Sequence, residues 1–491
     1  MTETETGDEL IDRRRKVPIR TKLLFAFGTL QEATVTAGGI VTMLFYNQVL
    51  GVSPALAGLA YLIVSIVDAV ADPVVGLWSD RFQSRWGRRH PFMFFSAFPI
   101  AIGFYFLYQP INGLSETGLV VWLVVFFAVV RLGQTFYLIP HDALGAELTD
   151  DYDDRTSVFG YNNVAEMILS MVTVAILYYL IFPTVEEGKN GLLNEAGYVV
   201  MAWTGSITIM FSVLLCTLGT LDQLPYMRKS EKSQKFFIRD YVAEIRTLLS
   251  NPSYLAACLS MLIMMIGLGI IAQVATYAYI YAFKLSSEQM FWATVAKTPG
   301  VFIALPLLYY LSKHFEKKQI MISTTLVTAL LVPLPHILML VGFFPGINSP
   351  FYLLAIFGPL FLAYAVYPIS YIVVDSQLAD IADQHELQTG NRSEGVIFSI
   401  RSFAKKTTQG VGGFLAGFGL ELIRFPDNAE EVGVPPEAID GLLFMNGPVY
   451  LVLYLVAIYF MTWYRIDRKT HAEILERLDA RRSEAASTNA L

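Results

Sequence analysis

Two carboxylates interrupt a hydrophobic stretch of the chain in the segment VDAVADPVVG (residues 67–76). Asp68 and Asp72 follow the uncharged run ALAGLAYLIVSIV (55–67) and are separated by one helical turn. On a helix this spacing puts both side chains on one face, about 6 Å apart. Two ionised carboxylates at that distance repel each other strongly in a low dielectric. The pair is stable if a cation lies between the carboxylates, if one is protonated, or if a basic side chain reaches them.

The chemistry that this pair suggests is cation binding. Oxygen ligands suit Na⁺ and Li⁺, and a pair of carboxylates can equally carry H⁺. Pro73 removes a backbone donor and can free a carbonyl oxygen one turn earlier as another ligand. A structural ion pair, or a place in an aqueous vestibule, is the alternative interpretation. Because ionisable groups inside membrane spans are functional by default, we expect a site here.

Composition indicates that lipid surrounds these residues. Of the 491 residues, 54% are hydrophobic and only 16% are charged, whereas soluble domains usually carry about 25% charged residues. A span across about 30 Å of hydrocarbon needs roughly 20 apolar residues. The sequence predicts twelve such spans, at 22–48, 55–78, 92–110, 118–140, 157–183, 198–221, 254–283, 290–311, 319–343, 351–375, 394–423 and 442–464.

Basic residues predict the orientation, because cytoplasmic loops are enriched in Lys and Arg. With a cytoplasmic N-terminus, that side receives most of the loop charges, including Arg13, Arg14, Arg15, Lys16, Arg81, Arg85, Arg88, Arg89, Lys313, Lys317, Lys318, Arg465, Arg468 and Lys469. The opposite loops hold Lys189, Lys284 and Arg424. The polar first residues do not resemble a cleavable signal peptide.

The expected fold is therefore an all-α membrane protein of two six-helix bundles. It comprises a cytoplasmic N-terminal tail (1–21), a first bundle (22–221), a cytoplasmic central loop (222–250), a second bundle (251–464) and a cytoplasmic C-terminal tail (465–491). Two repeated bundles are typical of transporters whose site lies between them at the membrane midplane.

The sequence contains no motif for a disulfide framework, a metal site or a nucleotide-binding loop. Cys216 and Cys258 lie in predicted spans and suggest neither a disulfide framework nor a metal site. The glycine-rich QGVGGFLAGFG (409–419) follows no strand, so it predicts close helix packing and not a nucleotide loop. We expect no cofactor, no metal beyond a coupling cation and no nucleic-acid partner. A polytopic membrane enzyme is a remote alternative, since it would need a nucleophile or metal constellation.

The loop after the second predicted span resembles the signature loop of the major facilitator superfamily. The match consists of Gly76-Leu-Trp-Ser-Asp80-Arg81 and Gly87-Arg88-Arg89, interrupted by FQSRW. Asp80 can cap or pair near a helix end, while the arginines hold the cytoplasmic surface. These residues form the expected gate region.

Longer motifs resemble the glycoside–pentoside–hexuronide:cation symporters, whose best-known member is melibiose permease. They are DAVADPVVG with SRWGRRHPF, IPHDALGAELTDDYDDRT (139–156), LADIADQHELQTGNRSEG (378–395) and Lys406. The resemblance implies that Asp68, Asp72 and Thr135 bind the coupling cation. Ala71 replaces an asparagine of the family, so one potential ligand is missing.

The solute site departs from melibiose permease. At the positions of its galactoside-binding charges this chain has Glu32-Ala33, Leu138 and Asn163. Animal sodium-dependent lysolipid transporters share the aspartate pair, the threonine, a lysine like Lys406 and a glutamate near Glu166. The resemblance thus implies the cation machinery but leaves the solute open.

Five further charges at membrane depth are expected to contact solute or couple the ligands. They are Glu32, Arg131, Glu166, Lys297 and Lys406. Arg131 equally fits an ion pair with Glu32 or Asp68, Glu166 an internal partner, and Lys297 a snorkelling position. The tyrosines at 277, 279, 281, 364 and 367 can stack on sugar faces or simply pack. His141 and Asp142 fit either a cytoplasmic gate or a helix-end hydrogen bond.

Taken together, the residues predict a symporter of the plasma (inner) membrane that acts by alternating access. Its expected ligands are a glycoside, oligosaccharide or uronate and a monovalent cation, Na⁺ or H⁺. The lipid bilayer is expected to surround the protein. The chain is expected to be a monomer and not an enzyme. A cation-coupled carrier of lysolipids or other amphiphiles is the alternative.

Overall fold

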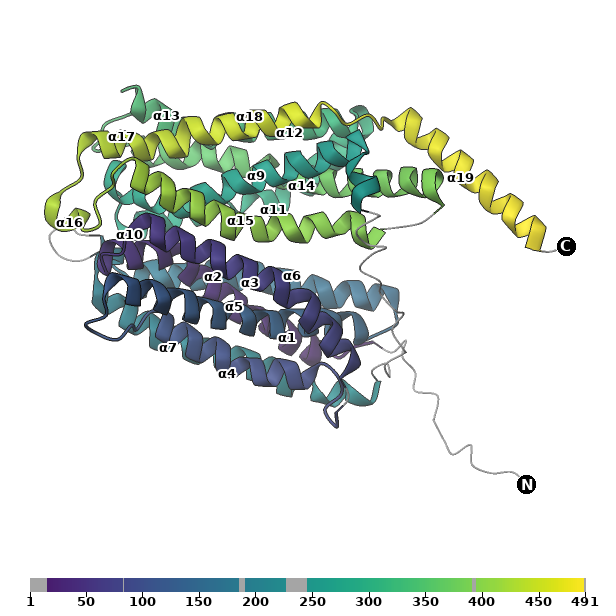
Figure 1. Cartoon of the computed structure of the whole chain (residues 1–491), viewed down its shortest axis with the longest axis horizontal. Coiled ribbons are helices and arrows are strands. Elements are labelled where there is room, and N and C mark those ends of the chain that lie inside the picture. Colours follow the sequence, from purple (N-terminus) through teal and green to yellow (C-terminus); the bar gives the residue numbers. More distant parts are fainter. Residues whose placement is uncertain (1–15, 83, 185–189, 227–244, 391–393, 490–491) are drawn as a thin grey trace. The chain divides into compact units, whose positions relative to one another are not determined.

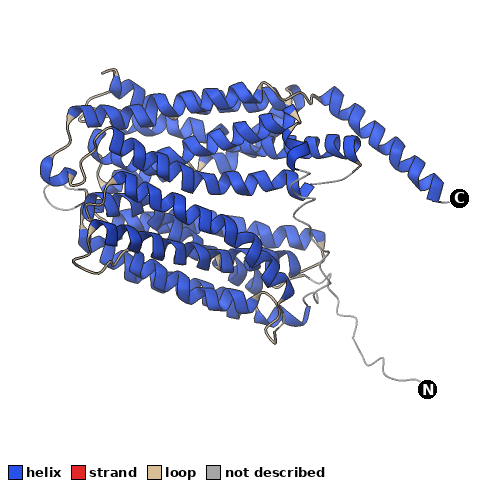
Figure 2. Ribbon diagram, in the orientation of Figure 1, coloured by secondary structure: helices blue, strands red, loops and turns tan. Residues whose placement is uncertain are grey.

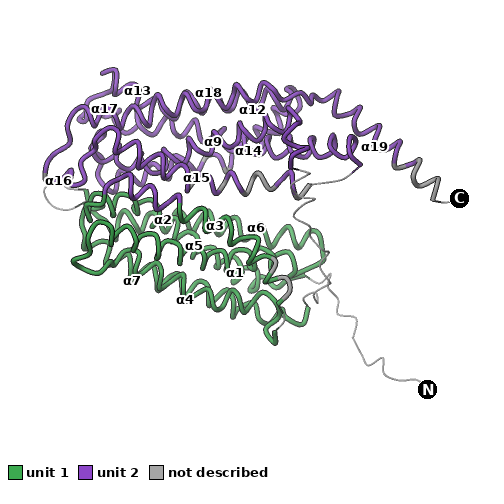
Figure 3. Tube along the Cα trace, in the orientation of Figure 1, with its two compact units in different colours: residues 1–52, 63–234 green, residues 53–62, 235–491 purple. Residues whose placement is uncertain are grey.

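The computed structural model describes residues 16–82, 84–184, 190–226, 245–390 and 394–489. Figure 2 shows that these residues form helices joined by loops, with no β-strand in the described ranges. The chain divides into two compact units, coloured separately in Figure 3. Unit 1 comprises residues 1–52 and 63–234, and unit 2 comprises residues 53–62 and 235–491.

Unit 1 contains the first half of the chain. Its helices are α1 (Ile19–Phe27), α2 (Thr29–Leu44), most of α3 (Pro54–Arg81), α4 (His90–Leu107), α5 (Glu116–Glu147), α6 (Tyr152–Ile176) and α7 (Glu195–Gly219). Shorter helical turns are η1 (Phe45–Val49), η2 (Leu177–Ile181), η3 (Gly191–Leu193) and η4 (Leu221–Tyr226). The first residues of α3 group with unit 2.

Unit 2 contains the remaining helices. They are α9 (Pro252–Tyr277), α10 (Ser287–Val295), α11 (Pro299–His314), α12 (Lys317–Leu331), α13 (Leu334–Leu340), α14 (Tyr352–Thr389), α15 (Glu394–Leu422), α16 (Ala429–Val432), α17 (Pro436–Phe444), α18 (Tyr450–Met461) and α19 (Arg468–Asn489). The turns η5 (Ala278–Ala282) and η6 (Met445–Val449) are π-helical.

Every span predicted from the sequence falls on helical structure. Within the described residues, nine helical segments are long and apolar enough to cross a membrane. The first expected span is divided at Gly28 into α1 and α2, and the eighth is divided at residues 296–298 into α10 and α11. The ninth is likewise divided at residues 332–333 into α12 and α13. The fold is therefore consistent with twelve spans, three of which are discontinuous.

Small residues let the helices of unit 1 approach closely. Helix α4 packs along both α5 and α7, as Figure 1 shows. Gly133 of α5 lies against Ile100 of α4, where a Cβ would come within 2.7 Å of the isoleucine side chain. Gly205 of α7 meets Phe104 in the same way. Such contacts are how helices pack in lipid, where the hydrophobic effect between helices is weak.

The glycine-rich segment of α15 crosses α9 at backbone contact. A Cβ on Gly412 would lie 2.5 Å from the Cα of Gly269, and a Cβ on Gly269 would lie 2.0 Å from the carbonyl oxygen of Thr408. Neither neighbour can rotate away, because both are backbone atoms. The prediction that residues 409–419 serve close packing is therefore confirmed.

The predicted C-terminal tail contains a long helix that the sequence reasoning missed. Helix α19 packs against the end of α14, and its Ile474 and Leu478 are buried within unit 2. In the polar run AEILERLDARR, Ile474 and Leu478 lie one helical turn apart, and this spacing was the sequence signal for a buried helix face.

We expect Gly412→Ala to destabilise unit 2, because the new methyl group forces α15 away from α9. Overpacking of this kind costs about 1–3 kcal/mol or more. Thermal unfolding of the purified protein in detergent measures the effect. Gly39→Ala is the matched control, since a Cβ there would meet no atom within 4 Å. Equal melting temperatures for the two variants would contradict the crossing described here.

Candidate functional site

The site is built from one face of α3 and one face of α5 in unit 1. Asp68 and Asp72 lie one turn apart on α3, and Arg131 and Thr135 lie one turn apart on α5. The Thr135 hydroxyl is 3.0 Å from Oδ1 of Asp68 and 3.1 Å from Oδ1 of Asp72. Three of the predicted cation-site residues are thus brought together.

Arg131 supplies the positive charge that the carboxylate pair requires. Its Nη2 donates to Oδ2 of Asp68 at 2.7 Å, and its Nη1 donates to Oε1 of Gln134 at 3.3 Å. The Asp68 side chain is only 5% exposed, so an uncompensated charge there would be costly. Of the partners considered for Arg131, the structure selects Asp68.

Thr135 cannot satisfy both carboxylates at once. A hydroxyl has one proton to donate, so one of the two carboxylate oxygens faces the oxygen lone pairs. With both carboxylates ionised, the cluster of Asp68, Asp72 and Arg131 carries one net negative charge. A proton or a monovalent cation among these oxygens would relieve both the repulsion and the charge.

The other predicted residues of unit 1 occupy varied environments. Glu32 on α2 is partly buried, whereas Asn163 and Glu166 on α6 are exposed in the described structure. Ala33 is buried, and Leu138 is partly buried on α5. Among the described contacts, none joins Glu32, Asn163 or Glu166 to the carboxylate pair.

In unit 2, Lys297 lies beside a group of tyrosines. Its Nζ is 5.7 Å from the ring centroid of Tyr364. The rings of Tyr364 and Tyr367 are 5.0 Å apart, and the Tyr367 hydroxyl donates to that of Tyr371 at 3.0 Å. Lys406, on α15, is partly buried. An ammonium group and aromatic faces therefore lie together in this unit.

The structure describes the side chains of two of the four predicted gate residues. Arg88 and Arg89 both bind Oε1 of Glu147 at the end of α5, at 2.7 and 3.1 Å. Arg89 also donates to the Ser79 hydroxyl at 3.0 Å. Asp80 and Arg81 form the end of α3, and their side chains lie outside the described part of the structure. The arginines thus fasten α3, α4 and α5 together at one end.

In unit 2 a similar set of polar contacts joins the ends of helices. The sequence analysis did not predict these pairs. Lys317 at the start of α12 binds both oxygens of Asp380 on α14 at 2.7 Å, and Tyr464 donates to Asp380 at 3.1 Å. His471 of α19 lies 3.5 Å from Asp380.

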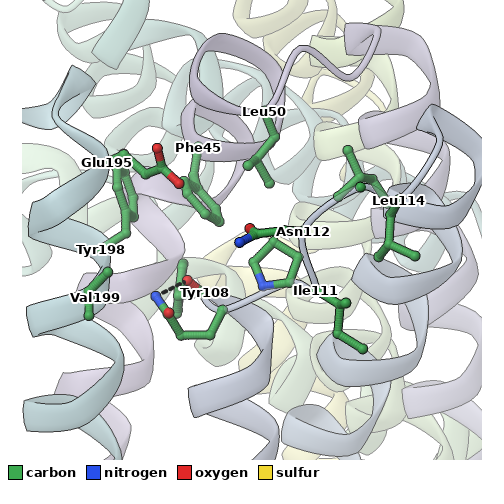
Figure 4. Close-up of a pocket in the computed structure, with 13 residues that line it drawn as sticks. Phe45, Leu50, Tyr108, Ile111, Asn112, Leu114, Glu195, Tyr198 and Val199 are labelled. Carbon is green, nitrogen blue, oxygen red and sulfur yellow. Dashed lines mark hydrogen bonds between the residues drawn. The ribbon is translucent and has the colours of Figure 1, made fainter.

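Two cavities lie away from the carboxylate pair. One, of about 280 Å³, is lined by Lys317, Asp380, Arg468, His471 and their neighbours in unit 2. The other, of about 170 Å³, lies in unit 1 among Phe45, Tyr108, Asn112, Glu195 and Tyr198 (Figure 4). None of the residues predicted to bind cation or solute lines either cavity.

Comparisons with known proteins identify the family and support the fold. The family model described as "MFS/sugar transport protein" matches residues 25–468. The glucuronide carrier protein homolog of Escherichia coli (strain K12) is 25% identical, over 91% of this chain and 92% of the relative. The isoprimeverose transporter of Lactiplantibacillus pentosus is 24% identical, over 88% and 86%. The crystal structure of a D-xylose-proton symporter has a TM-score of 0.59 at 15% identity, covering 90% of this chain and 96% of that one, which supports the fold.

We expect Thr135→Val to destabilise the cation-free protein, because the two carboxylates lose their shared donor. The loss of such a buried hydrogen bond is worth about 1–3 kcal/mol. Thermal melting in sodium-free buffer measures this, with Thr135→Ser as the control that retains the hydroxyl. A Val variant that melts like the Ser variant would remove Thr135 from the pair.

Proposed function

Because the chain belongs to the MFS/sugar transport protein family, and within the major facilitator superfamily to the glycoside–pentoside–hexuronide:cation symporters, we propose that it moves a glycoside, oligosaccharide or uronate together with one Na⁺ or H⁺. At the coarser level the protein is a multi-pass membrane transporter of the cation-coupled sugar type and not an enzyme. The coupling ion and the solute are the proposal.

The observation that carries the proposal is the cluster of Asp68, Asp72 and Thr135 beside Arg131. Two carboxylates and one tethered guanidinium leave a single negative charge, which one monovalent cation would neutralise. The hydroxyl lies within hydrogen-bonding distance of both carboxylates, so small movements would gather three oxygens around one ion. Hard oxygen ligands of this type suit Na⁺, and a proton shared by the carboxylates would serve the same purpose.

Arg131 has a defined task in this scheme. Its hydrogen bond to Asp68 holds one carboxylate in place while Asp72, which is less buried, faces the incoming ion. A single ion pair between Arg131 and Asp68 needs only one carboxylate, whereas two carboxylates within hydrogen-bonding distance of one hydroxyl are the arrangement that a bound cation would use.

The solute class follows from the charges outside the cation cluster. Relatives carry names that refer to a glucuronide, to isoprimeverose and to a glycoside. Here Lys297 stands beside Tyr364 in unit 2. An ammonium group next to aromatic rings suits a sugar with an acidic substituent, because the rings cover the apolar sugar face and the ammonium pairs with the carboxylate.

In the proposed cycle, cation and solute bind to one state and each raises the affinity for the other. The repeated bundles then rock to open the site on the other side of the membrane. The distribution of Lys and Arg supports a plasma (inner) membrane protein with both termini in the cytoplasm. We propose that the monomer is the transporting unit.

We expect Asp68→Asn and Asp72→Asn each to abolish accumulation of solute against its gradient, while the protein still inserts and folds. Asparagine keeps the side-chain volume but lacks the charge that the cation requires. Losing a charged partner is worth about 1.5–3 kcal/mol, so ion activation should weaken at least about tenfold. Uptake into vesicles under imposed Na⁺ or H⁺ gradients measures this.

The control for these variants is Asp440→Asn, which changes an exposed carboxylate on α17. It should leave both accumulation and ion activation unchanged. Undiminished cation-driven accumulation in both the Asp68 and the Asp72 variants would overturn the proposed cation site.

We expect a glucuronide to be taken up at least about tenfold better than melibiose, since Ala33, Leu138 and Asn163 cannot supply the charges that read galactoside hydroxyls. Lys297→Gln should remove most of the glucuronide uptake, whereas Lys313→Gln should not. Lys313 is the matched control because its Nζ also lies over a tyrosine ring, that of Tyr309, at 4.0 Å. Competition by melibiose, glucuronides and lysolipids for one labelled solute identifies the class. Preferred transport of melibiose, or of a lysolipid, would contradict the uronate assignment.

A further inference from the structure

The first membrane span is broken at Gly28, and the break is covered by side chains from α5 and α7. The Gly28 N–H bonds to the carbonyl oxygen of Phe25 at 3.1 Å, three residues back, and a new helix starts at Thr29. Ser212 of α7 donates to the carbonyl oxygen of Phe27 at 3.0 Å. The backbone groups that a continuous helix would satisfy internally are thus met by side chains.

His141 of α5 holds the α1 side of this break. Its Nε2 is 3.1 Å from the carbonyl oxygen of Phe25. Its ring stacks on that of Phe25, with centroids 4.1 Å apart and planes at 2°. Tyr137 covers the other face at 5.2 Å. The side chain is only 2% exposed, so this polar contact is shielded from water. His141 therefore bonds across to another helix and does not merely cap its own.

The space around Gly28 is too small for any side chain at this position. A Cβ on Gly28 would lie 2.1 Å from the Tyr137 hydroxyl, 2.9 Å from Sγ of Cys216 and 3.0 Å from Nε2 of His141. The Cys216 thiol itself lies 3.6 Å from the Phe25 carbonyl oxygen. Glycine at this position allows three polar groups to meet the bare backbone of the first span.

The two nitrogens of the His141 ring both face acceptors. A carbonyl oxygen cannot donate, so the contact with Phe25 requires a proton on Nε2. On the other side, Nδ1 lies 3.6 Å from a carboxylate oxygen of Asp142, which also only accepts when ionised. A neutral imidazole has one proton and can serve one of these acceptors. Only the imidazolium form serves both.

We propose that His141 is a proton-binding site, separate from the aspartate pair, whose occupied form clamps α1 to α5. Besides Asp142, the titratable groups packed near the ring are Tyr137 on α5 and Cys216 on α7. The charge of Glu32 on α2 interacts electrostatically with the Tyr137 hydroxyl. As pH rises and the proton leaves, the remaining proton can move to Nδ1, facing Asp142. The Nε2 lone pair then faces the Phe25 carbonyl oxygen, and the clamp weakens.

The clamp lies close to the cation cluster along one helix. Thr135 and His141 are less than two turns apart on α5, with Pro140 between them. Release of α1 from His141 would let the segment of the first span before Gly28 move while the segment after it stays packed. The site therefore adds a proton-dependent hinge to the unit that carries the carboxylate pair.

The test measures the hinge directly and needs no solute, so its outcome is independent of the proposed function. Spin labels are placed on α1 at Arg20→Cys and near the end of α5 at Ala146→Cys, both exposed positions. The native cysteines are both buried. We expect one narrow distance distribution at pH 6 and an added longer component at pH 9.

Two variants should abolish this pH dependence for different reasons. In His141→Gln the amide donates to the carbonyl oxygen but does not titrate, so the distribution should be the same at both pH values. In Asp142→Asn the amide can donate to Nδ1, so the neutral ring keeps its proton on Nε2 and the distribution should stay narrow. Asp142 is 74% exposed, which makes this variant safe for folding. Cys258→Ala, which removes the buried cysteine of unit 2, is the control and should retain the pH response.

Nitrogen-15 spectra of histidine-labelled protein supply the second readout. The His141 signal, identified by its loss in His141→Gln, should show protons on both ring nitrogens at pH 6. His336 is the internal comparison, because it is equally buried and its ring nitrogens have no hydrogen-bond partner within the described residues. A singly protonated His141 at pH 6, an unchanged distance in the parent, or a parent-like shift in His141→Gln would each overturn the proposal.

Discussion

A hydroxyl group has one proton to donate, and at Thr135 two carboxylates compete for it. This constraint governs the centre of unit 1. Asp68 also accepts from Arg131, and Asp72 shares the Thr135 hydroxyl with it. The close packing of α4 against α5 through Gly133 and Ile100 holds in place the helix that carries Thr135. The charge arrangement is thus a property of helix packing as well as of residue type.

The same type of end contact fastens each unit. In unit 1 a base at the start of α4, Arg89, binds Glu147 at the end of α5. In unit 2 a base at the start of α12, Lys317, binds Asp380 late in α14. Each pair joins consecutive spans at the corresponding place in the repeat, although the residues differ in type. The two units are therefore alike in the chemistry of these helix ends.

The sequence predicted those features that depend on local spacing. The aspartate pair, the glycine crossing of α15 and the helical spans all follow from periodicity and residue size. Arg131 was left with several possible partners, since the choice of Asp68 depends on the rotation of α5 about its axis. Helix α19 was missed because only Ile474 and Leu478 mark its buried face within a polar segment.

The break at Gly28 was also missed, for a different reason. A helix-period pattern runs through it without interruption, and glycine is common in membrane helices. What stabilises the break comes from far along the chain, since His141 and Ser212 reach the backbone across 116 and 185 residues. No local pattern could have shown which donors would meet the carbonyl groups of Phe25 and Phe27.

The breaks in the first and eighth expected spans share a geometry. At Gly28 and at Lys297 the backbone N–H bonds three residues back, to Phe25 and Thr294, both at 3.1 Å. Such tightened turns leave carbonyl groups that side chains must satisfy, which a membrane protein tolerates only where the backbone is buried or lines a cavity. A charged residue lies close to each break, Glu32 one turn after Gly28 and Lys297 within the second. In each of these two spans a helix break therefore lies within about one helical turn of a charged side chain.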